Sequence, residues 1–330
     1  MLQVPLAERE DARVRVEPEW RSPDEHPSVV LRDLIGRRRP DGHIIAFANE
    51  KGGVGKSTLA FQCAVALAHR GKKVIAIDCD SRQRSLHRLF EARDGAIRTL
   101  KVDLPRPRHT PLAFPTGSML LQELDRVGIH SDFVIIDLPG HDSPIVRRAV
   151  AVADTVVTPV NSSALDLDSL GAINPVTRRL RGMGPFAEVV AGLRDERIER
   201  GMEPFEWVVV KNRVRHYEQR LIHLAEQQLL QMARTIGFRT IEGLTERLAY
   251  RELLPFGLTQ LDLKHLPWLQ RPRSVPGREL RRFVEGLQLP LDRPSRADGR
   301  RFLPRAPVLS QVVERYRKAL GAAPLPEMAD

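Results

Sequence analysis

Residues 50–58 read EKGGVGKST, a pattern typical of a phosphate-binding loop. The apolar run 43–48 before it suits a buried strand, and residues 57–69 after it place apolar side chains on one helical face. Strand, glycine-rich turn and helix follow each other in the order that such a loop requires. The loop glycines allow positive φ angles, so that backbone N–H groups can turn toward a phosphate. We therefore expect a nucleotide site at this turn.

Two loop side chains are expected to meet the phosphates and a cation. Lys56 would neutralise the β and γ phosphates of the nucleotide, and the Ser57 hydroxyl would ligate Mg²⁺. A glycine-rich turn before an ordinary helix is the alternative, but Lys-Ser at this spacing argues against it. The loop residues predicted to bind the cofactor are Gly52, Gly53, Val54, Gly55, Lys56, Ser57 and Thr58.

Two further apolar segments, 73–80 and 133–137, end in aspartates. Continuous apolar strands are typical of a parallel sheet covered on both faces, and ligands bind at the carboxyl ends of such strands. We therefore predict an α/β fold in which Asp78, Asp80 and Asp137 point at the phosphates. Asp137 is expected to act on Mg²⁺ through water, and either Asp78 or Asp80 could face the metal. A helix-capping role is the alternative for each aspartate.

A second lysine, Lys51, stands at the start of the loop, where Glu50 replaces the usual first glycine. With the aspartates, this lysine makes the chain resemble the deviant-Walker P-loop ATPases of the ParA/MinD group. The resemblance implies a mostly parallel sheet flanked by helices, and Mg-dependent hydrolysis of ATP to ADP and phosphate. It also implies a homodimer in the ATP state, in which Lys51 reaches the partner's phosphates and offsets their negative charge.

Within this group the chain resembles the MipZ branch, over about residues 42–291. The stretches SRQR (81–84) and RELLPFG (251–257) carry this narrower resemblance, whereas a partitioning ParA usually has Pro-Gln where this chain has Ser81-Arg82. The branch implies inhibition of FtsZ assembly, a ParB-like centromere-binding partner, and nonspecific binding of double-stranded DNA by the dimer. The expected location is cytoplasmic, associated with the nucleoid and enriched near the cell poles.

The resemblance also assigns roles to single residues. Lys51, Lys56 and Asp80 are the expected catalytic residues, and Asp80 would position the attacking water. Asn212 matches the position that reads the adenine edge, and Arg213 beside it is expected to stack on the base. A strand-terminal turn residue is the alternative for Asn212. The expected metal site consists of Ser57, Asp78 and Asp137, and Pro159 and Asn161 are expected to border the nucleotide pocket or the dimer face.

Composition supports some partners and argues against others. The 330 residues carry a formal charge of +10, which favours nonspecific contact with phosphate backbones. For the arginines in the third quarter of the chain, a solvated basic helix face is the alternative.

The two cysteines, Cys63 and Cys79, form no CxxC pair, which favours buried thiols in a reducing cytosol. No apolar run is long enough to span a bilayer, and a membrane partner is not expected. The candidate DNA contacts are Arg213, Arg215, Arg220, Arg234, Arg239, Arg247 and Arg251.

The chain is expected to hold one ATPase domain, residues 42–291, between two tails. Residues 1–41 mix both charges with prolines and predict a mostly disordered extension, with one short docking helix around residues 29–35. Residues 292–330 combine a Pro/Arg-rich linker with an amphipathic helix over 308–320. Within the domain, the proline-rich residues 101–131 are expected to form an irregular surface connection before a helix at 120–127.

Three other functions remain open at this point. The first is a ParA-type ATPase that partitions chromosomes, plasmids or cargo. The second is a MinD-type regulator that cycles on membranes through residues 308–320. The third is a metabolic ligase or kinase on the same fold, against which Lys51 argues because an enzyme acting as a single subunit has less use for such a lysine.

Overall fold

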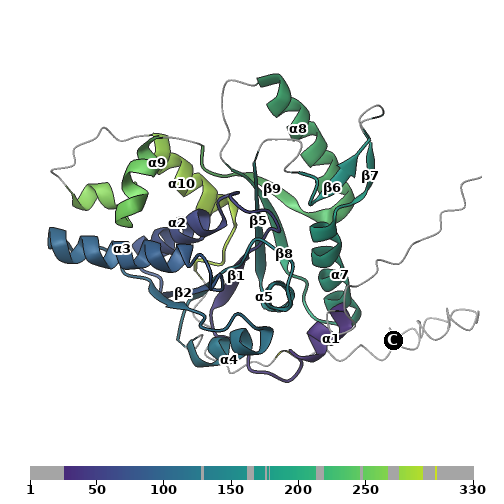
Figure 1. Ribbon diagram of the computed structural model, residues 1–330, viewed down its shortest axis with the longest axis horizontal. Helices are drawn as coiled ribbons and strands as arrows, with labels where there is room; N and C mark the ends of the chain where they lie inside the picture. The colour runs from purple at the N-terminus through teal and green to yellow at the C-terminus, as the bar shows by residue number, and fades with distance from the viewer. Residues whose placement is uncertain are drawn as a thin grey trace, which may run out of the picture.

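A seven-stranded sheet in which every paired strand is parallel forms the centre of the molecule (Figure 1), in the order β3-β2-β4-β1-β5-β8-β9. The computed structural model describes residues 26–127, 130–161, 167–174, 177, 179–212, 219–245, 248–266, 275–292 and 302. The sheet strands are β1 (His43–Phe47), β2 (Val74–Asp78), β3 (Arg108–Pro111), β4 (Phe133–Asp137), β5 (Thr155–Asn161), β8 (Glu206–Asn212) and β9 (Arg239–Glu242). A separate antiparallel pair consists of β6 (Gly171–Ile173) and β7 (Leu180–Met183).

Helices cover both faces of the sheet and enclose a separate apolar core on each (Figure 1). One face carries α2 (Lys56–His69), α3 (Ser85–Leu100), α9 (Leu248–Leu253) and α10 (Val275–Gly286). The other carries α1 (Pro27–Arg32), α4 (Gly117–Val127), α5 (Pro144–Val152), α7 (Pro185–Glu199) and α8 (Gln219–Met232), the last continued by the π-helical turn η2 (Ala233–Gly237). Two 3₁₀ turns, η3 (Leu254–Phe256) and η4 (Asp262–His265), follow α9.

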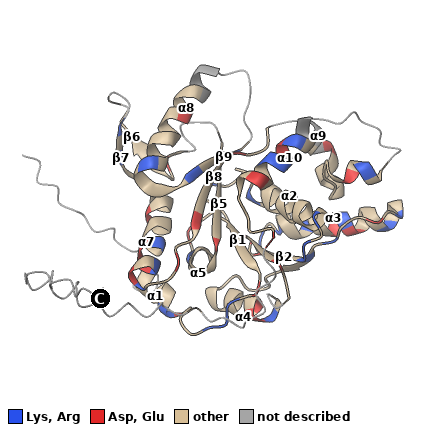
Figure 2. Cartoon of the chain, turned by 180° about the vertical axis from the view of Figure 1, so that it is seen from behind, with Lys and Arg blue, Asp and Glu red and all other residues tan. Residues whose placement is uncertain are grey.

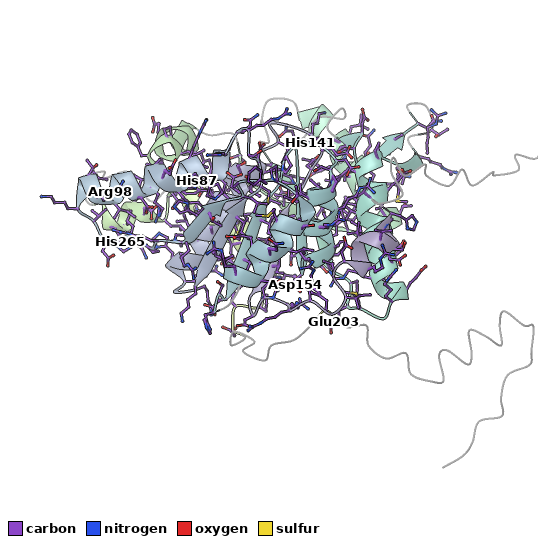
Figure 3. The ribbon with its side chains drawn as sticks, turned by 60° about the horizontal axis from the view of Figure 1, so that its bottom comes forward. His87, Arg98, His141, Asp154, Glu203 and His265 are labelled. Carbon is purple, nitrogen blue, oxygen red and sulfur yellow. The ribbon has the colours of Figure 1, made fainter. Side chains whose placement is uncertain are left out.

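The central strands are mostly apolar because both of their faces are covered, and β2 and β4 end in the buried aspartates Asp78 and Asp137. Every residue of β2 and β4 is buried, as is β1 after its first residue. This burial confirms the α/β fold with a parallel central sheet. The register places Asp137 beside both Phe47 and Asp78, so that the carboxyl ends of β1, β2 and β4 lie side by side. Figure 3 shows His141 at this end of the strands, with Asp154 and Glu203 at the opposite end.

Residues 101–131 differ from the irregular connection expected from their prolines. Residues 108–111 form strand β3, which pairs in parallel with β2 at the end of the sheet. Proline has no N–H group for a ladder hydrogen bond and is tolerated on an edge strand, where only one side is paired. Pro111 ends β3, and Pro105 and Pro107 precede it. The expected helix at 120–127 is confirmed as part of α4.

The short docking helix expected near residue 30 is present as α1. Val30, Leu31 and Leu34 have no exposed surface, and α1 packs against α5 and α7. The backbone of Phe302 exchanges hydrogen bonds with Gly36 and Arg37. Residues on both sides of the predicted 42–291 domain therefore contact the core, and those boundaries stay predictions. The predicted helix 308–320 lies outside the described residues, and among those described no helix is long and apolar enough to cross a membrane.

A buried ion pair joins α3 to the segment after α9. Both ends of the Arg93 guanidinium donate to the Asp262 carboxylate, at 2.8 and 2.9 Å, and both side chains are almost fully buried. Arg93 also donates to the Gly257 carbonyl, and Asp262 accepts further bonds from Thr259 and His69. Burial alone would raise the pKa of Asp262, but the bonds from Arg93 and His69 outweigh it and hold that pKa below 3.8.

Removing the arginine should leave a buried, uncompensated carboxylate. We predict that Arg93→Met lowers the free energy of unfolding by about 3–5 kcal/mol in urea titrations at pH 7. Arg70→Met is the matched control, because its ion pair with Glu285 is exposed and contributes little. Equal stability of the Arg93→Met variant and the wild type would show that this pair does not hold α3 in place.

Candidate nucleotide site

The loop between β1 and α2 has the backbone conformation that a phosphate cradle requires. Gly53 and Gly55 adopt positive φ angles of 75° and 95°, a region that favours glycine. Gly55 is also the N-cap of α2, so the free N–H groups of the first helical turn open toward the loop. Val54 between these glycines is fully buried and anchors the loop to the core.

Two buried asparagines hold the loop at its two ends. The Asn49 side-chain amide donates to the Pro159 carbonyl at 2.7 Å, and its oxygen accepts the Lys51 N–H at 2.9 Å. The Asn212 amide donates to the Val54 carbonyl at 2.8 Å. The loop is thereby tied to the carboxyl ends of β5 and β8. No role was predicted for Asn49 from the sequence. The position of Asn49 directly before the loop is the only sequence signal that could have revealed one.

The side chain of Asn212 is bonded to protein backbone on both of its polar atoms. Its amide group contacts Val54, its oxygen accepts the Leu244 N–H at 3.3 Å, and it does not line the cavity described below. Reading of the adenine edge by Asn212 therefore stays a prediction. Arg213 lies outside the described residues. Pro159 supplies a carbonyl to Asn49, and neither it nor Asn161 borders this cavity.

Lys56 is buried beneath the loop, and its side chain reaches back to the start of the loop. Its ammonium group donates to the Lys51 carbonyl at 3.0 Å. Burial lowers the pKa of Lys56, while the charges of Asp137 and Asp80 oppose that shift. Gly140, after β4, packs against the same place, since a Cβ there would lie 3.3 Å from the Gly52 backbone and the Lys56 ammonium. The loop after β4 thus fits directly against the phosphate loop.

Asp137 has the most unusual environment at this edge of the sheet. It is 1% exposed, and neither carboxylate oxygen has a hydrogen-bond partner of full geometry within the described residues. Burial and the nearby charge of Asp78 raise the pKa of Asp137 to about 8, although Ser57 and Lys56 lie close enough to lower it. A buried carboxylate with no hydrogen-bond partner of full geometry, beside a hydroxyl and an ammonium, suits a divalent cation held partly through water.

The two aspartates at the end of β2 have separate surroundings. Asp78 accepts the backbone N–H groups of Asp80 and His87, one on each oxygen, at 3.0 and 2.9 Å. Burial, as the largest influence, raises its pKa. The oxygens of Asp78 thus bond the backbone of the turn between β2 and α3, and its side chain does not line the cavity described below, so its approach to the phosphates stays a prediction. Asp80 lines the cavity and accepts the N–H groups of Arg82 and Gln83.

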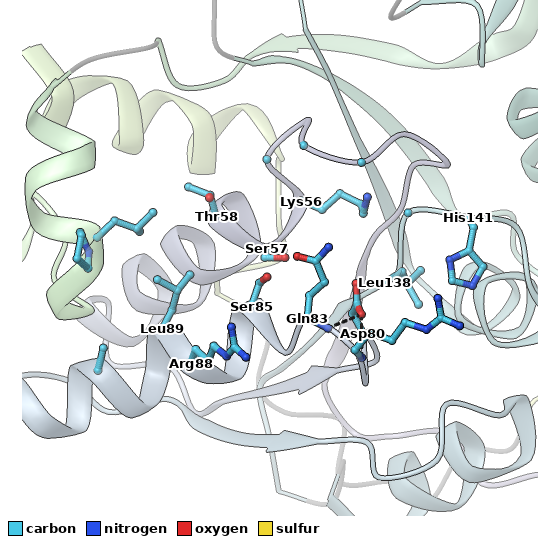
Figure 4. A pocket seen from close by; sticks show the side chains of 18 residues that line it. Lys56, Ser57, Thr58, Asp80, Gln83, Ser85, Arg88, Leu89, Leu138 and His141 are labelled. Atoms are coloured by element: carbon cyan, nitrogen blue, oxygen red, sulfur yellow. Dashed lines mark hydrogen bonds between the residues drawn. The ribbon is translucent and has the colours of Figure 1, made fainter.

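A cavity of about 690 Å³ lies between the phosphate loop, the first turns of α3 and η3. Figure 4 shows Lys56, Ser57, Asp80, Gln83 and His141 around it. Lys51 is partly exposed and does not line this cavity, so its role toward a partner stays a prediction. The sequence motifs identified the loop residues, but they assigned no role to the residues that form the opposite walls of the cavity. Those walls include Gln83, Ser85, Arg88, Leu89, Ala92, His141, Leu254 and Pro255.

The structure describes only some of the arginines that were predicted to contact DNA. Arg234 is exposed in η2, whereas Arg239 is paired with Glu206 and also donates to the Gly286 carbonyl. The side chains of Arg213, Arg215, Arg220, Arg247 and Arg251 lie outside what the structure describes. Lys and Arg positions, blue in Figure 2, also lie along α10, a group that sequence reasoning did not single out. Its exposed members are Arg278, Arg281 and Arg282.

Both cysteines are buried and free, as expected. Burial raises the pKa of Cys63 to about 12 and that of Cys79 well above its ordinary value. Neither thiol is therefore a thiolate at neutral pH. Within the described part of the chain, no group of three or more histidines, cysteines or acidic residues could hold a metal ion. A cation at Asp137 would accordingly need Ser57, water and phosphate oxygens as further ligands.

This fold and loop define a P-loop protein of the ParA/MinD class, as the sequence resemblance predicted. Residues 43–291 match the model of one family in this class, described as ATPase MipZ, and the chain belongs to that family.

Curated relatives and solved structures agree with this placement. The chain is 35% identical to a protein ParA of Rhizobium radiobacter over 124 residues, which are 37% of this chain and 50% of that protein. It is 29% identical to the chromosome-partitioning ATPase Soj of Thermus thermophilus over 161 residues, 43% and 64% of the two chains. The matches thus span about half to two thirds of these relatives. The ATP complex of a Cyanothece McdA variant shares the fold, with a TM-score of 0.50, 15% identity and coverage of 87% and 99%.

The pKa of Asp137 predicts how pH affects the protein without nucleotide or Mg²⁺. A folded-state pKa of about 8, against 3.8 for an ordinary aspartate, means that ionisation destabilises the folded state. Stability should therefore fall as pH rises from about 4 to about 8. In EDTA, Asp137→Asn should reduce this slope, and its free energy of unfolding in urea should exceed that of the wild type at pH 8 by on the order of a few kcal/mol. The exposed Asp195→Asn variant should keep the wild-type slope. Parallel profiles for the wild type and Asp137→Asn would contradict the assignment.

The contact between Asn212 and Val54 predicts a loss of affinity that does not depend on the base. Asn212→Ala leaves the buried Val54 carbonyl without its donor. We expect it to weaken Mg·ATP and Mg·tripolyphosphate by a similar factor, about ten-fold or more, in titration calorimetry. A loss confined to ATP would instead support the adenine-reading role.

Proposed function

We propose that this protein is an ATP-dependent dimerisation switch that hydrolyses ATP slowly to ADP and phosphate. The observation that carries the proposal is the buried Asp137 carboxylate beside Lys56 and Ser57, beneath a glycine loop that is held by two asparagines. A divalent cation bound here would offset the charge of the buried carboxylate, and the loop would bind the phosphates of the nucleotide that accompanies it. Membership in a family of ATPases supports ATP as the ligand.

Each residue of the site would have a separate role in binding or hydrolysis. Lys56 and the N–H groups of the loop would bind the β and γ phosphates, and Ser57 and Asp137 would hold Mg²⁺. When bound, Mg²⁺ supplies neutralisation of the charge on the phosphates. Asp80 faces the cavity with its carboxylate fixed by the turn at residues 82 and 83, a suitable position from which to orient the attacking water. Water then attacks the γ phosphorus, and ADP leaves.

Dimerisation would follow from the charge that two nucleotides bring together. Lys51 stands at the start of the loop and does not line the cavity of its own subunit. In our proposal it reaches the phosphates of the partner subunit, whose negative charge needs an additional cation at the interface. Hydrolysis removes the γ phosphate and with it much of this attraction, so the dimer separates. Monomer and dimer would thus be the two states of the switch.

The dimer would bind double-stranded DNA without sequence preference. The net charge of +10, the exposed Arg234 and the outward arginines of α10 support contacts to phosphates. Two copies double the number of phosphate contacts, so the dimer binds much more tightly than the monomer. Nucleoid association and enrichment near the poles through a ParB-like protein would follow in the cell.

The cellular role that we propose is placement of the division plane through inhibition of FtsZ assembly. Its support is membership in the MipZ family over residues 43–291. A ParA-type ATPase that partitions chromosomes, plasmids or cargo is the second candidate. The local identity to a protein ParA and to the chromosome-partitioning ATPase Soj favours it.

Pelleting of FtsZ filaments separates these two roles. FtsZ is assembled with GTP, and this protein is added with Mg·ATP as wild type, Asp80→Ala or Lys51→Ala. We predict that the wild type and Asp80→Ala reduce the pellet several-fold and that Lys51→Ala does not, because only the first two form the ATP-bound dimer. Omission of ATP is the control.

An unchanged pellet with every variant would contradict the FtsZ role. The same proteins would then be tested on a nonspecific DNA duplex with and without ATP. DNA binding that requires ATP and Lys51 would favour the partitioning role.

A further inference from the structure

Four polar side chains line the nucleotide cavity without a hydrogen bond or ion pair to the part of the chain that the structure describes. They belong to Arg82, Gln83, Arg88 and His141. The two guanidinium groups only donate hydrogen bonds, whereas the neutral amide of Gln83 both donates and accepts. A neutral imidazole does so as well, but His141 lies on the loop after β4, away from the space between Ser57 and Asp80 (Figure 4). Gln83 is therefore the side chain to consider for a role in the reaction.

The turn between β2 and α3 holds Gln83 next to the carboxylate of Asp80. The Gln83 backbone N–H donates to Asp80 Oδ1 at 2.9 Å, and the Arg84 N–H donates to the Asp80 carbonyl at 2.8 Å. Arg84, the N-cap of α3, has a positive φ of 48°, a conformation that costs energy for a residue with a side chain. In Figure 4 the side chain of Gln83 extends into the cavity between Ser57 and Asp80.

This position matches what an attacking water requires. Such a water directs a lone pair at the γ phosphorus, so both of its hydrogens need acceptors on the protein side. The Asp80 carboxylate accepts one of them, and as an ionised group it donates nothing in return. The Gln83 amide offers an oxygen for the second hydrogen and an N–H for a γ phosphate oxygen. A glutamine orients the water in the same way in other P-loop enzymes.

We propose that Gln83 is a further catalytic residue, which orients the attacking water together with Asp80. Its Oε1 accepts a hydrogen of the water, and its Nε2–H donates to the γ phosphate. The water oxygen then bonds to the γ phosphorus, the bond from that phosphorus to the bridging oxygen breaks, and its electron pair leaves with ADP. Both hydrogens of the water end on the released dihydrogen phosphate. This inference rests on the proposed ATP hydrolysis and deepens it.

The assignment predicts an effect on the chemical step and little effect on binding. Gln83 contacts the water and the transferring phosphate, whereas Lys56, Ser57 and the loop bind the rest of the nucleotide. Interactions that are made mainly in the transition state change the rate of the reaction without a matching change in affinity. A Gln83 variant therefore still forms the ATP-bound dimer and remains in it longer than the wild type.

Single-turnover hydrolysis by the full-length protein at saturating Mg·ATP tests the assignment. Gln83→Met keeps the length and neutrality of the side chain but removes both polar functions. We expect hydrolysis to slow by about ten-fold or more, because the water is no longer held in line with the γ phosphorus. Gln227→Met is the matched control and should keep the wild-type rate, since Gln227 is exposed on α8 and does not line the cavity.

A transition-state analogue separates a role in the reaction from a structural role. Mg·ADP with aluminium fluoride mimics the transferring phosphoryl group with the attacking water in place. Gln83→Met should weaken this complex by about ten-fold or more and leave the Kd of Mg·ADP alone within about two-fold. Equal weakening of both ligands would mean that the variant disturbs the turn, and it would overturn the assignment.

Two further outcomes distinguish this inference from the proposed switch. Hydrolysis by the wild type and by Gln83→Met at the same rate would overturn the role of Gln83 and leave the ATPase intact. Absence of hydrolysis in the wild type would overturn the proposed ATPase and the role of Gln83 with it.

Discussion

The buried carboxylate of Asp137 is the constraint on which the site depends. A charge with almost no solvent contact and no full hydrogen bond destabilises the folded protein unless positive charge lies next to it. The parallel register places this carboxylate beside the ends of β1 and β2, above which Lys56 and Ser57 begin α2. The folded chain thus holds a buried negative charge that a bound divalent cation would offset, which couples the binding of that cation and its nucleotide to stability.

Rigidity around this charge comes from contacts that are distant in the sequence. Asn49 and Asn212 fasten the phosphate loop to β5 and β8, and Gly140 allows the loop after β4 to approach it closely. On the other side of the cavity, Arg93 and Asp262 hold α3 against the segment that follows α9. Preorganised donors of this kind bind phosphate without a large rearrangement.

Local patterns were sufficient to predict the strands that contain Asp78 and Asp137, the phosphate loop and the helix after it, because apolar runs and glycine spacing act over a few neighbouring residues. Partners far along the chain were not predictable in this way. The contact of Asn212 with Val54 and the pairing of β3 with β2 both depend on how the sheet is assembled. The backbone hydrogen bonds that Asp78 accepts likewise depend on the exact path of the chain between β2 and α3.

The central claim is that ATP closes two copies of this chain through Lys51. Sedimentation equilibrium of Asp80→Ala with saturating Mg·ATP tests it most directly, because this variant should bind ATP without resetting. We predict the mass of a dimer for Asp80→Ala and the mass of a monomer for the Lys51→Ala/Asp80→Ala double variant under the same conditions. A monomer in both cases, or a dimer that forms equally well without Lys51, would contradict the account.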